Sequence, residues 1–166
     1  MLDISGFHRN YQDKSLNDLY FSVDYKNPLI KKLIQNFKQE PFVKELSEPL
    51  SFLIISHFQL MDNQPDFRNF SLIPVPLDKK RLKWRGFNQA EELARKLQKF
   101  FNVPLVTDCL IRIKDDFLIK EKEIIENKNI LLVDDFFSTG STMEKCAKAL
   151  KESQTKKVIG IVIARE

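Results

Sequence analysis

Apolar residues recur along the chain in two patterns, short unbroken runs and longer segments spaced by three or four residues. Short runs are typical of strands, and spacing by three to four is typical of helices. We predict strands near residues 19–25, 70–77, 103–106, 110–113, 130–133 and 158–164, and helices over 29–37, 42–60, 90–101 and 141–152. Alternation of the two predicts an α/β fold, a mainly parallel sheet of about five strands flanked by helices.

The length of 166 residues predicts a single domain with a substantial core. Residues 1–18 are polar without a clear period and are expected to form a loose lead-in, followed by an N-terminal strand and helices over 19–62 and an α/β core over 70–166. No apolar run approaches the roughly 20 residues of a membrane span, and the N-terminus does not resemble a signal peptide. We therefore expect a cytoplasmic protein without a membrane partner.

A run of small and acidic residues follows the apolar strand at 130–133. Asp134 and Asp135 come first, and residues 138–142 then lead into a helical pattern. Ligands of open α/β sheets bind beyond the carboxyl ends of the strands, and a helix N-terminus suits a phosphate. The acidic pair is placed to accept hydrogen bonds from sugar hydroxyls or to hold Mg²⁺. The segment thus predicts a ribose 5-phosphate site, with the phosphate held by Ser138, Thr139, Gly140, Ser141 and Thr142.

This segment has other possible interpretations. Asp134 and Asp135 could simply connect a strand to a helix that Ser141 or Thr139 caps. A receiver domain also carries an acidic pair after a strand, but near its start, and too little chain follows Asp135 here. Neither the P-loop pattern nor Gly-x-Gly-x-x-Gly can be formed from the four glycines.

A basic segment follows the predicted strand at 70–77. Pro74 and Pro76 predict an extended loop, and five cations fall within residues 79–85, before the helix at 90–101. A basic loop beside the acidic one is expected to hold a pyrophosphate, which Mg²⁺ bridges to the sugar. The cations expected to face the pyrophosphate are Lys79, Arg81 and Arg85.

Two further interpretations of the basic segment stay open. It is either a solvated loop before a helix, or a nucleic-acid contact in which Trp84 and Phe87 stack on bases between cations. The net charge of +4 suits a polyanionic ligand and a weak nucleic-acid surface equally. Cys109 and Cys146 form no Cys-x-x-Cys motif, which indicates two reduced thiols.

The stretch from Ile130 to Thr142 resembles the phosphoribosyl-pyrophosphate (PRPP) signature of type I phosphoribosyltransferases. A second motif is similar to that of the ComF family, phosphoribosyltransferase-like proteins associated with bacterial competence for DNA uptake. It consists of Ile-Pro-Val-Pro-Leu, basic residues, and then Arg-Gly-Phe-Asn-Gln-Ala at 85–90. Residues 25–38 resemble the helix that precedes the core in that family. The resemblance covers about residues 19–113 and 129–166.

This resemblance implies a type I phosphoribosyltransferase-like fold and Mg²⁺-dependent transfer of phosphoribose from PRPP to an acceptor, with release of pyrophosphate. Asp134 and Asp135 would bind the ribose hydroxyls and stabilise positive charge at the sugar, and residues 138–142 would hold the 5′-phosphate. The alternative hypothesis is a non-catalytic PRPP- or nucleotide-binding accessory protein in DNA uptake that contacts nucleic acid through the basic loop.

Two features depart from the ComF pattern. Many members begin with a cysteine-rich zinc-binding module, but neither cysteine here lies in the first hundred residues, so we expect no zinc. Members usually carry Thr-x-x-Gln and Arg-x-x-Asn segments that build a hood over the site. Residues 114–128 match neither segment and are predicted to be helical, with Asp115 and Asp116 at a helix start. Because a hood excludes water from an oxocarbenium-like transition state, its shortening favours binding over turnover.

Overall fold

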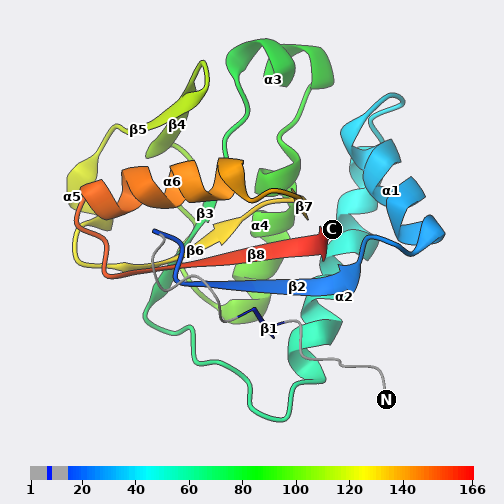
Figure 1. The fold of residues 1–166 in the computed structure, drawn as a ribbon, viewed down its shortest axis with the longest axis horizontal. Coiled ribbons are helices and arrows are strands. Elements are labelled where there is room, and N and C mark those ends of the chain that lie inside the picture. The colour runs from blue at the N-terminus through cyan, green and yellow to red at the C-terminus, as the bar shows by residue number, and fades with distance from the viewer. Residues whose placement is uncertain (1–6, 9–14) are drawn as a thin grey trace.

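The computed structural model describes residues 7–8 and 15–166, so most of the predicted lead-in lies outside the described residues. A sheet in the order β1-β2-β8-β6-β3 forms its centre, and β7 also pairs with β8 (Figure 1). All of these pairs are parallel except β1 with β2. The strands are β1 Phe7–His8, β2 Asp18–Asp24, β3 Phe70–Pro74, β6 Asn129–Val133, β7 Phe136–Phe137 and β8 Lys157–Arg165. The predicted α/β fold is confirmed.

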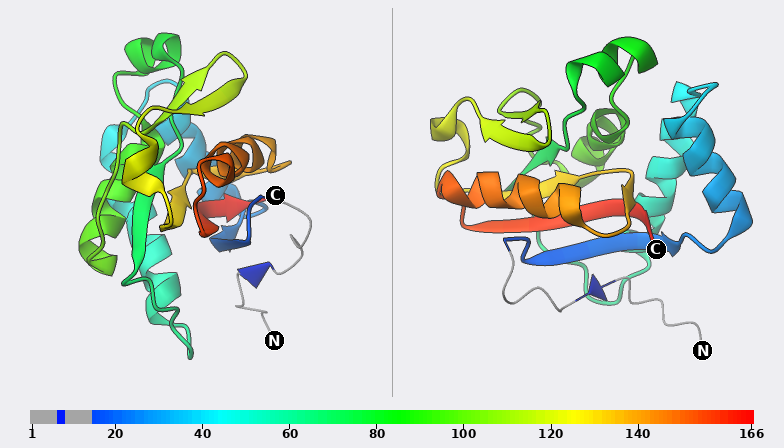
Figure 2. Two further views of the ribbon diagram at one scale, coloured as in Figure 1. Left: turned by 90° about the vertical axis from the view of Figure 1, so that its left-hand side faces the viewer. Right: turned by 45° about the horizontal axis from the view of Figure 1, so that its top comes forward.

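Helices cover both faces of this sheet, and a separate antiparallel hairpin stands above one end (Figure 2). The hairpin consists of β4 Leu110–Ile113 and β5 Asp116–Ile119. The helices are α1 Pro28–Lys38, a 3₁₀ turn Lys44–Leu46, α2 Ser47–Gln59, α3 Lys79–Arg85, α4 Gln89–Phe101, α5 Lys122–Ile125 and α6 Ser141–Glu152. None of the helices in this part of the chain has the length and apolar character needed to cross a membrane.

Two hydrophobic cores lie on opposite faces of the sheet, and successive residues of β6 alternate between them. Ile130 and Leu132 pack in the core beneath α6, α5 and the hairpin, whereas Leu131 and Val133 pack in the core shared with α1, α2 and α4. A strand that is buried on both faces has no reason to alternate apolar with polar residues. This explains the unbroken apolar run before the acidic pair.

A capping residue and a proline set the start of α1. The Asn27 side-chain oxygen accepts a hydrogen bond from the Leu29 N–H at 3.0 Å, and Pro28 occupies the first helical position. The helix ends at Lys38, which is followed by an extended residue, Gln39. The C-terminal turn of α1 is thereby placed beside the carboxyl ends of the strands.

Two predicted strands are placed differently in the structure. The segment 103–106 contributes only a parallel bridge between Leu105 and Leu72, flanked by two hydrogen bonds to Leu72. Pro104 has no N–H to donate, which limits a longer ladder. The strand predicted near residues 19–25 is β2; its alternating pattern favours a sheet edge, but β2 lies between β8 and the two-residue strand β1.

The helix predicted over residues 114–128 is wrong for most of that segment. Residues 110–119 form the β4–β5 hairpin, and only Lys122–Ile125 are helical. Asp115 and Asp116 therefore lie at the hairpin turn and the start of β5, not at a helix start. Phe117 is buried while Leu118 is exposed, which is the alternation of a half-buried strand.

Candidate functional site

The acidic pair lies directly beyond β6, at the carboxyl end of a central strand. Hydrogen bonds to β8 continue past the strand end: the Asp134 N–H donates to the Ile161 carbonyl at 3.0 Å, and the Ile163 N–H donates to the Asp135 carbonyl at 3.2 Å. The Asp135 N–H also donates to Asp134 Oδ1 at 2.8 Å. The backbone beneath both carboxylates is therefore fixed by the sheet.

The two carboxylates have different surroundings. The Asp135 side chain is only 4% exposed, and its Oδ1 lies 3.1 Å from Nζ of Lys38 at the end of α1. Burial raises the pKa of Asp134 to about 8, and the neighbouring charge of Asp135 adds to this rise although Lys38 opposes it. Asp134 therefore holds its proton to a higher pH than an ordinary aspartate does, whereas Asp135 is the residue that forms the ion pair with Lys38.

The charge of Lys38 is stabilised by the acidic pair. Burial lowers the pKa of its ammonium group, but Asp135 and Asp134 outweigh this effect and raise the pKa overall. The ammonium group therefore stays charged across the physiological range.

The predicted phosphate loop, residues 138–142, leads from β7 into the first turn of α6. Gly140 is the residue that precedes the helix, and its φ of +77° is a left-handed conformation that favours glycine. A Cβ at this position would also collide with the Phe137 ring. Gly140 has no side chain to cap α6, and only the Ser141 N–H meets a hydroxyl, Thr139 Oγ1 at 3.4 Å, so the following N–H groups of the first turn are placed to meet an anion.

The hydroxyl groups of this loop lie around the same helix end. Thr139 Oγ1 and Ser141 Oγ are 3.2 Å apart, and the Ser138 hydroxyl donates to Glu166 Oε2 at 3.2 Å. The alternative in which Thr139 or Ser141 takes the N-cap position is not observed, since Gly140 takes it. Glycine with flanking hydroxyls is suited to close approach by a phosphate.

The predicted basic loop is instead a short helix, α3. Asp78 caps its N-terminus by accepting the Arg81 N–H at 2.9 Å. Gly86 ends it in a left-handed conformation, with its N–H donating to the Leu82 carbonyl at 2.9 Å. These two caps explain why seven residues with five cations adopt a helix. In Figure 1, α3 stands at the top of the molecule.

The residues after α3 attach it to the fold. Phe87 is buried, and its ring centroid lies 5.7 Å from that of Phe37 on α1. Asn88 caps α4 by accepting the Ala90 N–H at 3.1 Å. Its amide also donates to the Val75 carbonyl at 3.0 Å, which holds the strand-end loop against α4.

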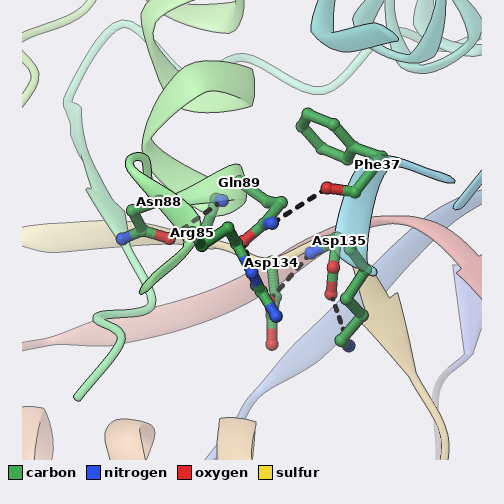
Figure 3. A network of polar contacts seen from close by, with 8 residues as sticks. Phe37, Arg85, Asn88, Gln89, Asp134 and Asp135 are labelled. Atoms are coloured by element: carbon green, nitrogen blue, oxygen red, sulfur yellow. Dashed lines mark hydrogen bonds and ion pairs between the residues drawn. The ribbon is translucent and has the colours of Figure 1, made fainter. Parts of the chain in front are cut away.

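Gln89 connects the basic helix to α1. Its side chain is buried, its Nε2 donates to the Phe37 carbonyl at 2.9 Å, and its Oε1 accepts a hydrogen bond from Arg85 Nη1. Figure 3 shows these contacts running from Arg85 through Gln89 to the end of α1, with Asp134 and Asp135 nearby. A buried amide therefore helps to set the separation between the basic helix and the acidic pair.

The acidic pair, the phosphate loop and α3 meet at one cleft with two parts. A pocket of about 170 Å³ is lined by residues 136–143 together with Lys38 and Asp134. A second pocket of about 100 Å³ adjoins it, and Lys38, Asp134 and Thr142 line both. The two motifs are thus brought together at the carboxyl edge of the sheet.

The second pocket is strongly cationic. Arg81, Arg85 and Arg112 line it, together with Lys38 and both acids. Lys79, which the sequence grouped with the two arginines of α3, is exposed and belongs to the lining of neither part. Arg112 comes from β4, so the hairpin contributes a cation that sequence reasoning did not include.

Sequence reasoning also missed Lys38 and the bridging role of Gln89. Lys38 is the last residue of an amphipathic helix, and only the resemblance of residues 25–38 to a known helix singled out this region. Gln89 belongs to the Arg-Gly-Phe-Asn-Gln-Ala motif, but no pattern in the sequence indicated that its amide reaches α1.

The acidic pair alone is not a complete metal site. Within residues 15–166, no group of three or more His, Cys, Asp and Glu side chains is placed to hold a metal ion. One oxygen of Asp135 also faces Lys38. Mg²⁺ favours six oxygens and keeps several waters. The carboxylates therefore fit Mg²⁺ only where a phosphorylated ligand supplies further oxygens.

Comparison with known proteins identifies the family. Residues 28–166 match the phosphoribosyl transferase domain. The chain belongs to this family. The resemblance to ComF proteins is also confirmed: the chain is 35% identical over 103 residues to Competence protein ComFC of Bacillus subtilis (strain 168), which covers 53% of this chain and 40% of the relative. Competence protein F of Haemophilus influenzae is 28% identical over 101 residues, covering 49% and 44%.

The chain spans less than half the length of these two curated relatives. Similar solved structures include a purine phosphoribosyltransferase from Pyrococcus horikoshii, with 16% identity, 69% of each chain covered and a TM-score of 0.44. Another is the AQ2163 protein from Aquifex aeolicus, with 15% identity, 87% of this chain and 86% of that one covered, and a TM-score of 0.47. The family assignment rests on the sequence match and not on these scores.

Proposed function

We propose that this protein binds PRPP and transfers its phosphoribosyl group to an acceptor, with release of pyrophosphate. One observation carries the proposal: an acidic pair, a helix N-terminus with hydroxyls, and two arginines of α3 converge on a single cleft. PRPP carries the matching groups, namely sugar hydroxyls, a 5′-phosphate and a diphosphate. Both curated relatives are named as competence proteins, and we extend a role in competence to this chain as part of the same proposal.

Each part of the cleft has a role in this reaction. The phosphate loop and the first N–H groups of α6 bind the 5′-phosphate. Asp134 and Asp135 accept hydrogen bonds from the ribose hydroxyls and stabilise positive charge that develops at the sugar. The bond from the anomeric carbon to the diphosphate breaks and its electron pair leaves with pyrophosphate, while the acceptor supplies the pair for the new bond.

The diphosphate is expected to bind at α3. Arg85 is partly buried, and its Nε has no hydrogen-bond partner among the described residues. A buried donor without a partner is costly, so an anionic oxygen beside it is favourable. Mg²⁺ bound to the diphosphate, with Asp134 and Asp135 nearby, would offset charge on the leaving group.

The test is calorimetric titration of PRPP with Mg²⁺ into the wild type and Asp134→Asn. Asp134 lines both parts of the cleft, and Asn keeps its shape, so saturable binding by the wild type should weaken strongly in the variant. Asp66→Asn is the matched control, because Asp66 lies in a different pocket and pairs with Arg68. A folded wild type that does not bind PRPP would refute the proposal.

Catalysis is measured separately, as pyrophosphate release from PRPP in the presence of candidate nucleobases. Acceptor-dependent release that Asp134→Asn abolishes supports transfer. PRPP binding without release for any acceptor supports the second hypothesis, a non-catalytic PRPP- or nucleotide-binding accessory protein. The shortened segment between β4 and β6 is the feature that favours this alternative, because a hood normally excludes water.

A nucleic-acid contact through α3 is the other candidate function. Trp84 is 63% exposed, and Lys79, Lys80 and Lys83 on the same helix are exposed. Base stacking between cations would weaken on Trp84→Ala and at high salt but would persist in Asp134→Asn. Fluorescence polarisation of a labelled single-stranded oligonucleotide, measured with these two variants, distinguishes this contact from a PRPP site.

A further inference from the structure

We propose that Lys38, from outside both sequence motifs, is a third ligand-binding group of this cleft and contacts an anionic group of the bound ligand. Lys38 is the last residue of α1. It lines the pocket of the phosphate loop and also the pocket of the basic helix. None of the cations of α3 lines both parts. The inference rests on the proposed function, because PRPP supplies the anionic group.

The ion pair with Asp135 places the Lys38 ammonium group on the open side of the site. The Asp135 side chain is 4% exposed, whereas that of Lys38 is 42% exposed. A ligand that enters the cleft therefore meets the ammonium group before the buried carboxylate. An ammonium group has three donors, and Asp135 Oδ1 takes one at 3.1 Å. Donors remain for a phosphate oxygen without loss of the contact to Asp135.

The two arginines of α3 that line the cleft have partners outside the acidic motif. Arg81 pairs with Asp78 at 3.3 Å, and Arg85 donates to Gln89. Lys38 instead pairs with a residue of the acidic motif itself. Its ammonium group therefore lies between the sugar site and the phosphate sites. There it reduces the repulsion between Asp135 and an anionic ligand.

Gln89 is the positioning residue for this arrangement. Its amide donates to the carbonyl of Phe37, the residue before Lys38, at 2.9 Å. This hydrogen bond is buried and connects the last turn of α1 to the start of α4. It holds the backbone from which the Lys38 side chain reaches the cleft, so Gln89 influences the ligand through Lys38 as well as through Arg85.

A purely structural role for Lys38 predicts different behaviour. A cation in the last turn of a helix is favourable in itself, and it also neutralises a buried carboxylate. If these were its only roles, Lys38→Met would have no further effect on ligand affinity once Asp135 is replaced by Asn. A ligand contact predicts that Lys38→Met weakens binding in both backgrounds.

The experiment is titration of PRPP into the wild type, Lys38→Met, Lys38→Arg, Asp135→Asn and the double variant Lys38→Met/Asp135→Asn. Lys32→Met is the matched control, because Lys32 is an exposed lysine on the same helix and lines neither pocket. Loss of one charge-assisted hydrogen bond predicts a roughly ten- to hundredfold weaker affinity for Lys38→Met. Lys38→Arg should recover part of it, and Lys32→Met should bind as the wild type does.

The outcomes separate this inference from the proposed function. Wild-type affinity in folded Lys38→Met overturns the role of Lys38 and leaves the PRPP site standing. An effect of Lys38→Met that vanishes in the Asp135→Asn background also overturns it, because the lysine would then act only by neutralising the carboxylate. Absence of PRPP binding by the folded wild type overturns both. Thermal unfolding of each variant shows whether it is folded.

Discussion

Replacing Asp134 by Asn should stabilise the ligand-free protein, and the gain should grow as the pH rises. Burial raises the pKa of the Asp134 carboxyl to about 8, compared with an ordinary value of 3.8, and Asp135 adds to the rise. The folded protein therefore holds a proton at pH values where the unfolded chain has lost it. Stability from this group is fully present below about pH 4 and is lost as the pH rises toward 8.

The size of the effect follows from the shift. Each pH unit between the two pKa values changes the free energy of unfolding by about 1.4 kcal/mol for one proton. From pH 5 to pH 7 the free-energy gain of Asp134→Asn over the wild type should therefore increase by up to roughly 3 kcal/mol. Coupling of Asp134 to Asp135 and Lys38 spreads the titration over several groups and makes this increase smaller. Asn cannot ionise, so the variant lacks this dependence.

The assay is urea unfolding of both proteins at pH 5, 6, 7 and 8, with the difference in free energy plotted against pH. Asp66→Asn is the control: a hydrogen bond from Arg68 lowers the pKa of Asp66 to about 2, so this carboxylate stays charged over the whole range. Its difference from the wild type should be flat. A flat difference for Asp134→Asn as well would refute the raised pKa of Asp134.

The remaining predictions concern the loop and the bridge. Gly86→Ala should cost about 1–2 kcal/mol from its left-handed φ of +83° alone, since nothing lies near the added methyl group. Gly140→Ala should cost that amount plus a packing penalty of about 1–3 kcal/mol against Phe137, and should weaken PRPP binding, measured by unfolding and calorimetry. Gln89→Leu should cost about 1–3 kcal/mol because it leaves the Phe37 carbonyl without its donor, and should weaken pyrophosphate binding more than ribose 5-phosphate binding. Equal loss for both ligands would contradict the bridging role of Gln89.

Much of the fold and both motifs could be predicted from the sequence because their signals are local. The apolar run at 130–133 is buried on both faces, and its acids follow at once. Parallel strands place their carboxyl ends on one edge, so the meeting of the two motifs follows from the strand assignments. The glycine in the phosphate loop is likewise required locally, by a left-handed φ at residue 140.

Other features depend on contacts that no local pattern reports. Lys38 and Asp135 are 97 residues apart in the chain, and their ion pair exists only because α1 ends beside the strand ends. The Gln89 amide reaches a carbonyl 52 residues away. The helix α3 was different: Asp78 and Gly86 are ordinary capping signals, but the density of positive charge between them favoured a loop interpretation.

Backbone hydrogen bonds hold the acidic side of the cleft, whereas side-chain contacts hold the basic side, so the two sides should tolerate substitutions differently. Asp134 and Asp135 are fixed by backbone hydrogen bonds to β8, which any residue other than proline at those positions would retain. The cations depend on side-chain contacts, with Arg85 held by Gln89 and α1 held by the same amide. Substitutions in the helices should therefore alter recognition of the diphosphate before they disturb the sugar site. A protein that lost transfer in this way would still bind a phosphorylated ribose, so the catalytic and accessory hypotheses share the same geometry at the sheet edge.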